Sequence, residues 1–213
     1  MICVSVAEPT LEACLAALDG LEFAEVRIDK MTDARPEDMP RLFSSDRPMI
    51  VTCRPGPHPE ILRGELLTAA IEAGAAYADI ELEAEPGLLK AVAETVRTRS
   101  ARLIISYHNH ESTPPGEELR GLRESCFESG ADIAKLACRV LNPRDAARLL
   151  GLLDDPRSQV VVGMGELGKI VRAAAPLLGG VFTFAAKAPG KETADGQLDR
   201  SSLERILREL TNL

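Results

Sequence analysis

The stretch Ala131-Asp132-Ile133-Ala134-Lys135-Leu136-Ala137 indicates a buried β-strand that carries one lysine. Short apolar runs of this kind are typical of the inner strands of a parallel sheet. Lys135 is therefore expected in a low-dielectric interior, where loss of hydration favours the neutral amine over the ammonium ion. Such an amine can form a Schiff base with a ketone, although a lysine in a strand can also lie at a sheet edge or reach solvent.

The same pattern recurs along the whole chain and predicts eight strands. The expected strands are residues 2–6, 23–29, 49–54, 77–82, 102–108, 132–138, 159–164 and 181–186. Amphipathic segments with apolar residues at three-to-four spacing lie between them and predict helices, among them residues 11–18, 66–72, 88–97, 117–128 and 201–210. Pro86, Pro143 and Gly168 mark further helix starts.

Eight strands that alternate with helices predict a (β/α)8 TIM barrel. We expect a single domain over residues 1–213, with no linker or low-complexity segment. The alternative is a doubly wound open sheet. The first strand is not followed by Gly-x-Gly-x-x-Gly, and eight units exceed the usual number for one open sheet, so the barrel is favoured.

Composition excludes several classes of function. The net charge of −8, without a lysine and arginine cluster, argues against nucleic acid as a partner. No apolar stretch reaches the roughly 18 residues that span a bilayer, and no basic leader precedes the first strand. We therefore expect a cytoplasmic protein without a membrane partner. The five cysteines are scattered and predict core thiols rather than disulfides or a metal site, and no cofactor is expected.

Polar residues gather where the predicted strands end. Period-two geometry places Glu25, Arg27 and Asp29 on one face of the second strand. The third strand ends at Arg54 and the fifth at His108. In a barrel these ends form one mouth, where chemistry takes place. Asp79 and Glu81, on the fourth strand, are expected to form structural ion pairs inside the barrel.

Six motifs, in order along the chain, resemble those of the type I 3-dehydroquinate dehydratases. They are Glu25-Val26-Arg27-Ile28-Asp29, Thr52-Cys53-Arg54, Ser106-Tyr107-His108-Asn109 with Thr113-Pro114, Gly130-Ala131-Asp132-Ile133-Ala134-Lys135, the segment from Met164 to Arg172, and Gly196-Gln197. Each motif alone is unspecific. Their common order over nearly the whole chain is specific.

The resemblance implies a catalytic pair and a set of binding residues. Lys135 would form the Schiff base and His108 would act as general acid and base. The substrate would be 3-dehydroquinate, a small molecule whose carboxylate and hydroxyls would be held by Glu25, Arg27, Arg54, Arg172, Thr193 and Gln197. The resemblance and the apolar helix faces also allow a homodimer.

The chain departs from the family pattern at several positions. The family has a glutamate after the strand-three arginine, where this chain offers His58 or Glu60 in a proline-rich loop. His110 replaces a usual phenylalanine, Val171 a usual serine, and Asp195 a usual proline in the closing loop. Residues 187–192 suggest a lid of altered length, and the chain lacks room for the N-terminal hairpin of longer members.

Two other functions remain open at this point. A class I Schiff-base aldolase also uses a lysine but typically takes phosphorylated sugars, and the glycine-rich residues 163–168 are a weak candidate for a phosphate site. A catalytically silent barrel could act as a binding module, but Lys135 and His108 are both present. His58 and His110 are expected to be solvated loop residues.

Overall fold

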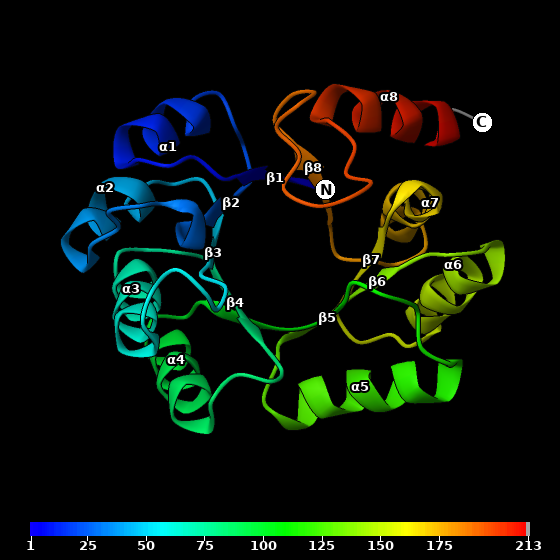
Figure 1. Cartoon of the computed structure of the whole chain (residues 1–213), viewed down its shortest axis with the longest axis horizontal. Helices are drawn as coiled ribbons and strands as arrows, with labels where there is room; N and C mark the ends of the chain where they lie inside the picture. The colour runs from blue at the N-terminus through cyan, green and yellow to red at the C-terminus, as the bar shows by residue number, and fades with distance from the viewer. Residues whose placement is uncertain (212–213) are drawn as a thin grey trace.

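The computed structural model describes residues 1–211, which form a ring of parallel strands surrounded by helices (Figure 1). The strands are neighbours in the order β7-β6-β5-β4-β3-β2-β1-β8. Sequence order therefore runs once around the ring without the reversal that defines a doubly wound sheet. The predicted (β/α)8 barrel is confirmed, and the open-sheet alternative is wrong.

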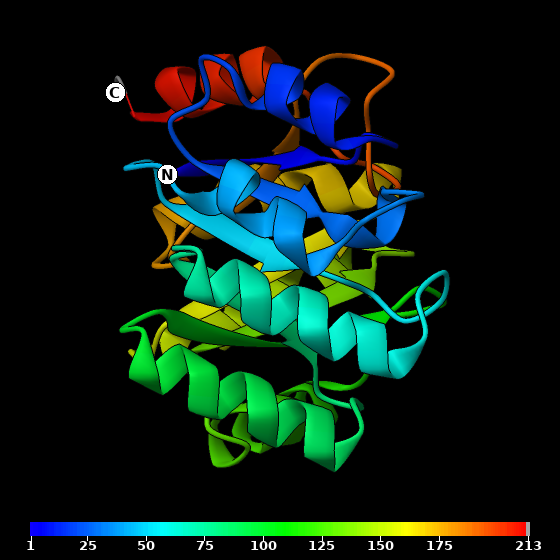
Figure 2. The same ribbon diagram turned by 90° about the vertical axis from the view of Figure 1, so that its left-hand side faces the viewer.

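The bounds of the elements follow the predicted alternation. The strands are β1 (Ile2–Val6), β2 (Ala24–Arg27), β3 (Met49–Thr52), β4 (Tyr77–Glu81), β5 (Arg102–Asn109), β6 (Ile133–Arg139), β7 (Gln159–Met164) and β8 (Thr183–Ala186). The helices are α1 (Leu11–Leu18), α2 (Met39–Phe43), α3 (Glu60–Glu72), α4 (Pro86–Thr98), α5 (Gly116–Glu128), α6 (Pro143–Leu150), α7 (Lys169–Ala174) and α8 (Arg200–Thr211). Figure 2 shows α2, α3 and α4 stacked on the outside of the strands.

The ring is paired unevenly. The longest ladders join β5 to β6 and β6 to β7. Between β7 and β8 the described backbone shows a hydrogen bond from Val181 N to Gln159 O of 2.9 Å, rather than a ladder. This seam is the most weakly joined part of the barrel wall.

The second strand ends earlier than the sequence pattern predicts. β2 stops at Arg27, and Ile28–Lys30 form a turn of 3₁₀ helix. The expectation that Asp29 shares a strand face with Glu25 and enters the mouth is wrong. The Asp29 carboxylate instead accepts two hydrogen bonds from the Arg27 guanidinium, of 2.9 and 2.7 Å, outside the lining of the cavity described below.

Three predicted helix starts are confirmed. Pro86 opens α4, where the Glu85 carboxylate accepts hydrogen bonds from the first backbone amides. Pro143 opens α6 behind a capping box formed by Asn142 and Asp145. Gly168 directly precedes α7.

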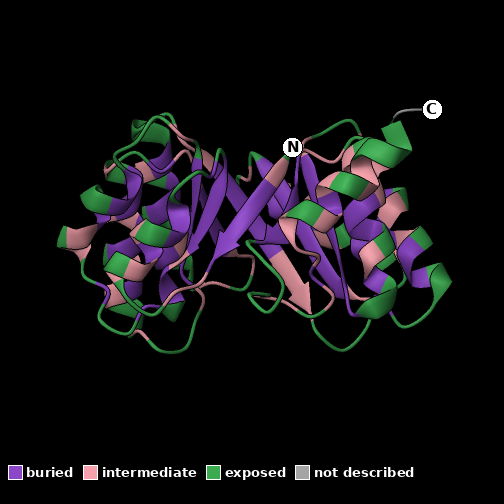
Figure 3. Cartoon of the chain, turned by 90° about the horizontal axis from the view of Figure 1, so that it is seen from above, coloured by how far each residue is buried: buried purple, intermediate pink, exposed green. Residues whose placement is uncertain are grey.

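Apolar side chains fill the N-terminal half of the barrel interior. Phe23, Tyr77, Phe182 and Phe184 pack with tilted or edge-to-face rings at centroid distances of 5.2–6.0 Å. Figure 3 shows that the strands are buried and that the exposed residues lie on the outer helix faces and in the loops. The interior is therefore closed at one end, and open space is left at the C-terminal ends of the strands. Among the described residues, no helix is both long and apolar enough to cross a membrane.

Gly163, in β7, touches the turn that follows the strand. A Cβ atom on Gly163 would lie 2.6 Å from Gly168 O and 2.7 Å from Gly168 Cα. We expect Gly163→Ala to lower the free energy of unfolding by about 1–3 kcal/mol, because backbone atoms would have to move. Urea denaturation followed by circular dichroism measures the change.

The matched control is Gly121→Ala, on α5, where an added Cβ meets no atom within 4 Å. This substitution should raise the free energy of unfolding by about 0.5–1 kcal/mol, because alanine favours the helix. Equal effects of the two variants would contradict the importance of the Gly163–Gly168 contact.

Candidate active site

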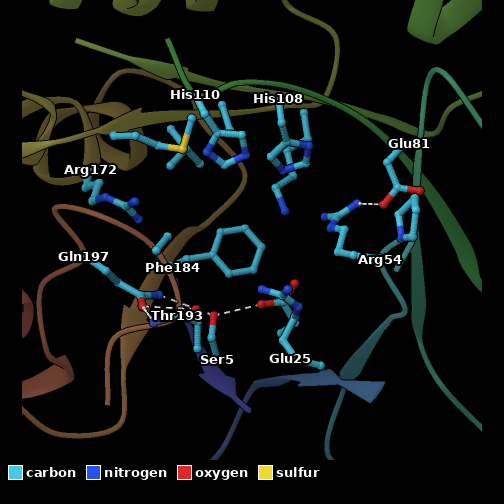
Figure 4. Close-up of a pocket in the computed structure, with 17 residues that line it drawn as sticks. Ser5, Glu25, Arg54, Glu81, His108, His110, Arg172, Phe184, Thr193 and Gln197 are labelled. Carbon is cyan, nitrogen blue, oxygen red and sulfur yellow. Dashed lines mark hydrogen bonds and ion pairs between the residues drawn. The ribbon is translucent and has the colours of Figure 1, made fainter. Parts of the chain in front are cut away.

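A cavity of about 420 Å³ opens at the C-terminal ends of the strands. All eight residues proposed from the sequence line it: Glu25, Arg27, Arg54, His108, Lys135, Arg172, Thr193 and Gln197. Figure 4 shows the side chains that line the cavity, with Phe184 near the middle of the view. The fold thus brings together residues that are more than 170 positions apart in the sequence.

Lys135 lies on the inner face of β6 and is 5% exposed. Its Nζ donates a hydrogen bond of 2.7 Å to Asp79 Oδ2 and lies 4.3 Å from the centre of the Phe184 ring. The apolar ring shields the amine from water on one side, and the carboxylate holds it on the other. The amine is therefore fixed in position at the cavity wall.

Asp79 is fully buried behind the cavity and contacts two cations. Arg54 Nη2 lies 2.9 Å from Asp79 Oδ2, and Ser106 Oγ donates a hydrogen bond of 2.6 Å to Asp79 Oδ1. Burial alone would raise the pKa of this carboxyl, but Arg54 and Lys135 hold the pKa well below its usual range. Asp79 is therefore ionised whenever the protein is folded near neutral pH.

Asp79 and Glu81 form the expected ion pairs, and one cation paired with Asp79 is Lys135 itself. Glu81 lines the cavity and joins Arg54, at 2.5 Å, to the buried Arg63 of α3. Asp79 carried the same signal as Lys135, a charged residue inside a buried apolar strand. They pair because β4 and β6 flank β5 in the barrel wall, so that the two side chains meet on its inner side.

His108, near the end of β5, is half-buried and lines the cavity. Burial lowers the pKa of His108 well below the usual histidine value, and the nearby cations Arg54 and Lys135 lower it further. The imidazole is therefore neutral near pH 7. A neutral imidazole can accept a proton, which is the property of a general base.

Glu25 is anchored by two hydroxyl groups. Ser5 Oγ and Thr52 Oγ1 each donate a hydrogen bond of 2.8 Å to its carboxylate. Gln197 Nε2 in turn lies 3.4 Å from Ser5 Oγ, and Gln197 Oε1 accepts hydrogen bonds from Thr193 N and Oγ1. Ser5 was missed from the sequence because a single serine in an apolar strand carries no distinctive pattern. It connects Glu25 to the closing loop.

Arg172, on α7, is 1% exposed, and its Nε and Nη2 have no hydrogen-bond partner among the described residues. Burial lowers the pKa of Arg172 to about 10, although Asp195 opposes the shift. A buried guanidinium with free donors is costly unless an anion binds to it. Because Arg172 lines the cavity, its free donors can bind an anionic group there.

The loop after β8 closes over the cavity and is held on the far side. Gly165 N donates a hydrogen bond of 3.1 Å to Asp195 O, and Arg139 Nη1 lies 3.2 Å from Asp195 Oδ2. Gly196 has a φ of 72°, and a Cβ atom there would lie 2.2 Å from Gly165 O. Glycine is therefore required where the loop crosses Gly165.

The two candidates for the missing loop glutamate lie outside the cavity lining. His58 Nε2 lies 3.2 Å from Ile28 O, and Glu60 pairs with Arg63 Nη1 at 3.1 Å. His110 is an exposed loop residue, as expected, and it also lines the cavity.

The cysteines are buried, as expected. Burial raises the pKa of the Cys53, Cys126 and Cys138 thiols to about 12. These thiols are therefore protonated and unreactive near neutral pH. Within residues 1–211, no group of three or more His, Cys, Asp or Glu residues is arranged to hold a metal ion.

The fold and the site together define a (β/α)8-barrel enzyme, with its polar residues at the C-terminal ends of the strands. Comparison with known proteins gives the family. The sequence pattern described as type I 3-dehydroquinase matches residues 2–213. The chain belongs to the type I 3-dehydroquinase family.

Individual relatives agree over nearly their whole length. The 3-dehydroquinate dehydratase of Desulfotalea psychrophila is 32% identical over 218 residues, covering 96% of each chain. That of Methanocaldococcus jannaschii is 31% identical over 224 residues, covering 98% of each chain. The crystal structure of the 3-dehydroquinate dehydratase from Aquifex aeolicus superposes with a TM-score of 0.82 at 27% identity, covering 100% of both chains.

We expect the His108 imidazole to bind a proton only below the usual pH range of histidine. The unfolded chain binds a proton to this imidazole near pH 6.5, whereas the folded chain binds it only at lower pH. The free energy of unfolding should therefore fall as the pH drops below about 6.5, and His108→Gln should reduce this loss. Nuclear magnetic resonance of the imidazole protons measures the titration, and each of the three histidines is assigned by substitution. A His108 midpoint at or above 6.5 would contradict the prediction.

Proposed function

We propose that this chain removes water from 3-dehydroquinate to give 3-dehydroshikimate, through an imine formed on Lys135. One observation carries the proposal. A buried amine and a buried arginine with free donors line the same cavity. The amine fits a ketone and the guanidinium fits a carboxylate, and 3-dehydroquinate carries both groups on one small ring.

The charges around Lys135 support its use as a nucleophile. The Asp79 carboxylate contacts both Lys135 and Arg54, at 2.7 and 2.9 Å. When Lys135 reacts as the free amine, Asp79 keeps its pair with Arg54. The free amine is thus available for attack without leaving an unpaired carboxylate behind it.

In the proposed reaction, His108 takes one proton from the substrate ring and returns it to the departing hydroxyl. Lys135 attacks the ketone carbon, water leaves, and a protonated imine forms. His108 accepts the proton from carbon 2, and the electrons of the broken C–H bond move into the imine to give an enamine. The enamine expels the hydroxyl of carbon 1, which the charged His108 protonates as water leaves. Hydrolysis of the remaining imine releases the product and the free lysine.

The other cavity residues are proposed to orient the substrate. Arg172 would bind the carboxylate with its two free donors, while Gln197 and Thr193 close the loop over it. Glu25, Arg27 and Arg54 would hold the ring hydroxyls, because each lines the cavity with polar atoms. These contacts would hold the substrate so that its reacting atoms lie close to Lys135 and His108.

The aldolase alternative is less well supported. It requires a phosphate site, and the candidate glycine-rich segment is used for packing, since Gly163 and Gly168 touch closely. A catalytically silent barrel would not explain why a lysine and an arginine with free donors are buried at the same cavity. The homodimer stays a prediction.

Borohydride trapping tests the imine. When borohydride is added during turnover of 3-dehydroquinate, we expect a reduced covalent adduct on Lys135 and loss of activity. Mass spectrometry of peptides locates the adduct. Product formation is followed by the absorbance of the conjugated enone.

Lys135→Met is the variant for comparison and should neither form the adduct nor turn over substrate. Lys187→Met is the matched control, because Lys187 lies outside the main cavity and contacts carbonyls of α1. An adduct on Lys30, Lys90, Lys169, Lys187 or Lys191 in the unsubstituted protein would overturn the assignment.

Substitution of His108 tests the proton transfers. His108→Ala should lower kcat by about 10²–10⁴-fold and change KM much less, because it removes the base but not the binding residues. An imine should accumulate and be visible by mass spectrometry of the protein during turnover.

His58→Ala serves as the control histidine, because His58 lies outside the cavity lining. It should keep kcat within about two- to threefold of the unsubstituted protein. Near-normal turnover of His108→Ala would remove His108 from the mechanism.

A further inference from the structure

His110 is the cavity residue that the proposed reaction leaves without a role. It follows the end of β5 by one residue and lies in a bend. Both imidazoles line the cavity, with ring centroids 6.3 Å apart and planes inclined by 12°. His110 is the more exposed of the two and therefore stands at the rim.

The position of His110 relates it to the arginine with free donors. Figure 4 shows His110 on the side of His108 toward Arg172, away from Arg54 and Glu81. A carboxylate bound to the Nε and Nη2 donors of Arg172 would share the cavity with His110, because both residues line it. The family pattern has a phenylalanine at this position, so the polar ring is a feature of this chain.

The cations around the cavity oppose a further positive charge. Arg27, Arg54 and Lys135 face it from β2, the loop after β3, and β6, and Arg172 faces it from α7. His108 is the other imidazole and is neutral near pH 7, because burial and nearby cations lower its pKa. Cationic side chains thus face the cavity from several elements, which favours an anionic ligand.

The anions near the cavity already have partners within the protein. Glu25 accepts hydrogen bonds from Ser5 and Thr52, and Glu81 pairs with Arg54 and Arg63. In the closing loop, Asp195 pairs with Arg139. A carboxylate that enters the cavity would be the first anion there without a partner and would favour the charged form of His110.

We propose that His110 is a second contact for the substrate carboxylate beside Arg172, and that it takes up a proton when the carboxylate binds. The inference rests on the proposed function only in that the substrate is a carboxylate. Binding and protonation are then linked, so lower pH strengthens binding. Histidine is suited to this because its charge changes between pH 5 and 8.

Quinate tests the inference, because it carries the carboxylate and ring hydroxyls but no ketone and so cannot form an imine. Calorimetric titration at pH 7.0 in two buffers of different ionisation enthalpy measures proton uptake on binding. Titration at pH 6.0 and 8.0 measures affinity. We expect proton uptake, and about tenfold tighter binding at pH 6.0, as for one charge-assisted hydrogen bond.

Three variants identify the group that takes up the proton. His110→Phe should bind quinate with no proton uptake and with equal affinity at both pH values. His110→Gln keeps a hydrogen-bond donor without the charge, and should bind more tightly than His110→Phe but equally at both pH values. His108→Gln should keep the proton uptake and the pH dependence, because His108 is already neutral in this range.

The results separate this inference from the proposed function. Unchanged pH dependence and proton uptake in His110→Phe would overturn the inference. So would failure of the unsubstituted protein to bind quinate while borohydride still traps substrate on Lys135. Absence of both quinate binding and the borohydride adduct would overturn the proposed function and, with it, the contact at His110.

Discussion

The carboxylate of Asp79 holds the charged part of the site together. It lies within 2.9 Å of both Lys135 and Arg54 and is oriented by Ser106. Burying a carboxylate is costly unless cations and hydrogen bonds compensate, and here both do. Because one carboxylate contacts both cations, it fixes the Lys135 amine and the Arg54 guanidinium relative to each other. The position of the amine at the cavity wall thus follows from a single contact.

This contact depends on the register of the barrel wall. Thr52 pairs with Asp79 between β3 and β4, Glu81 with Ser106 between β4 and β5, and Ser106 with Lys135 between β5 and β6. The polar residues therefore lie at similar heights on neighbouring strands. A shift of any strand by one residue would turn its side chains to the helix layer and break the network. The apolar layer around Phe182 lies below and fills the space that water would otherwise occupy.

The sequence was sufficient for the barrel and for the residues that line its mouth. Apolar periodicity identified the strands, and polar residues at strand ends identified part of the site, because both are local patterns. Arg172, Thr193 and Gln197 were implied only by the resemblance to the type I 3-dehydroquinate dehydratases. The pairing of Asp79 with Lys135 could not be predicted, since it depends on distances across the barrel. The placement of Asp29 was wrong because the chain turns at Ile28, which the alternating pattern does not reveal. That the exposed His110 also lines the cavity could not be predicted, because local sequence does not show which loop residues face inward.

Because the barrel wall is paired unevenly, the cavity residues fall into two groups according to the strands that carry them. Lys135 and His108 stand on β6 and β5, within the longest ladders. Arg172 and Gln197 follow β7 and β8, on either side of the seam bridged by Val181 and Gln159. Motion at that seam would shift the groups proposed to hold the carboxylate and leave the amine and imidazole in register. The proposed imine-forming lysine therefore stands where the barrel wall is most extensively paired, whereas the proposed carboxylate site borders its least-paired seam.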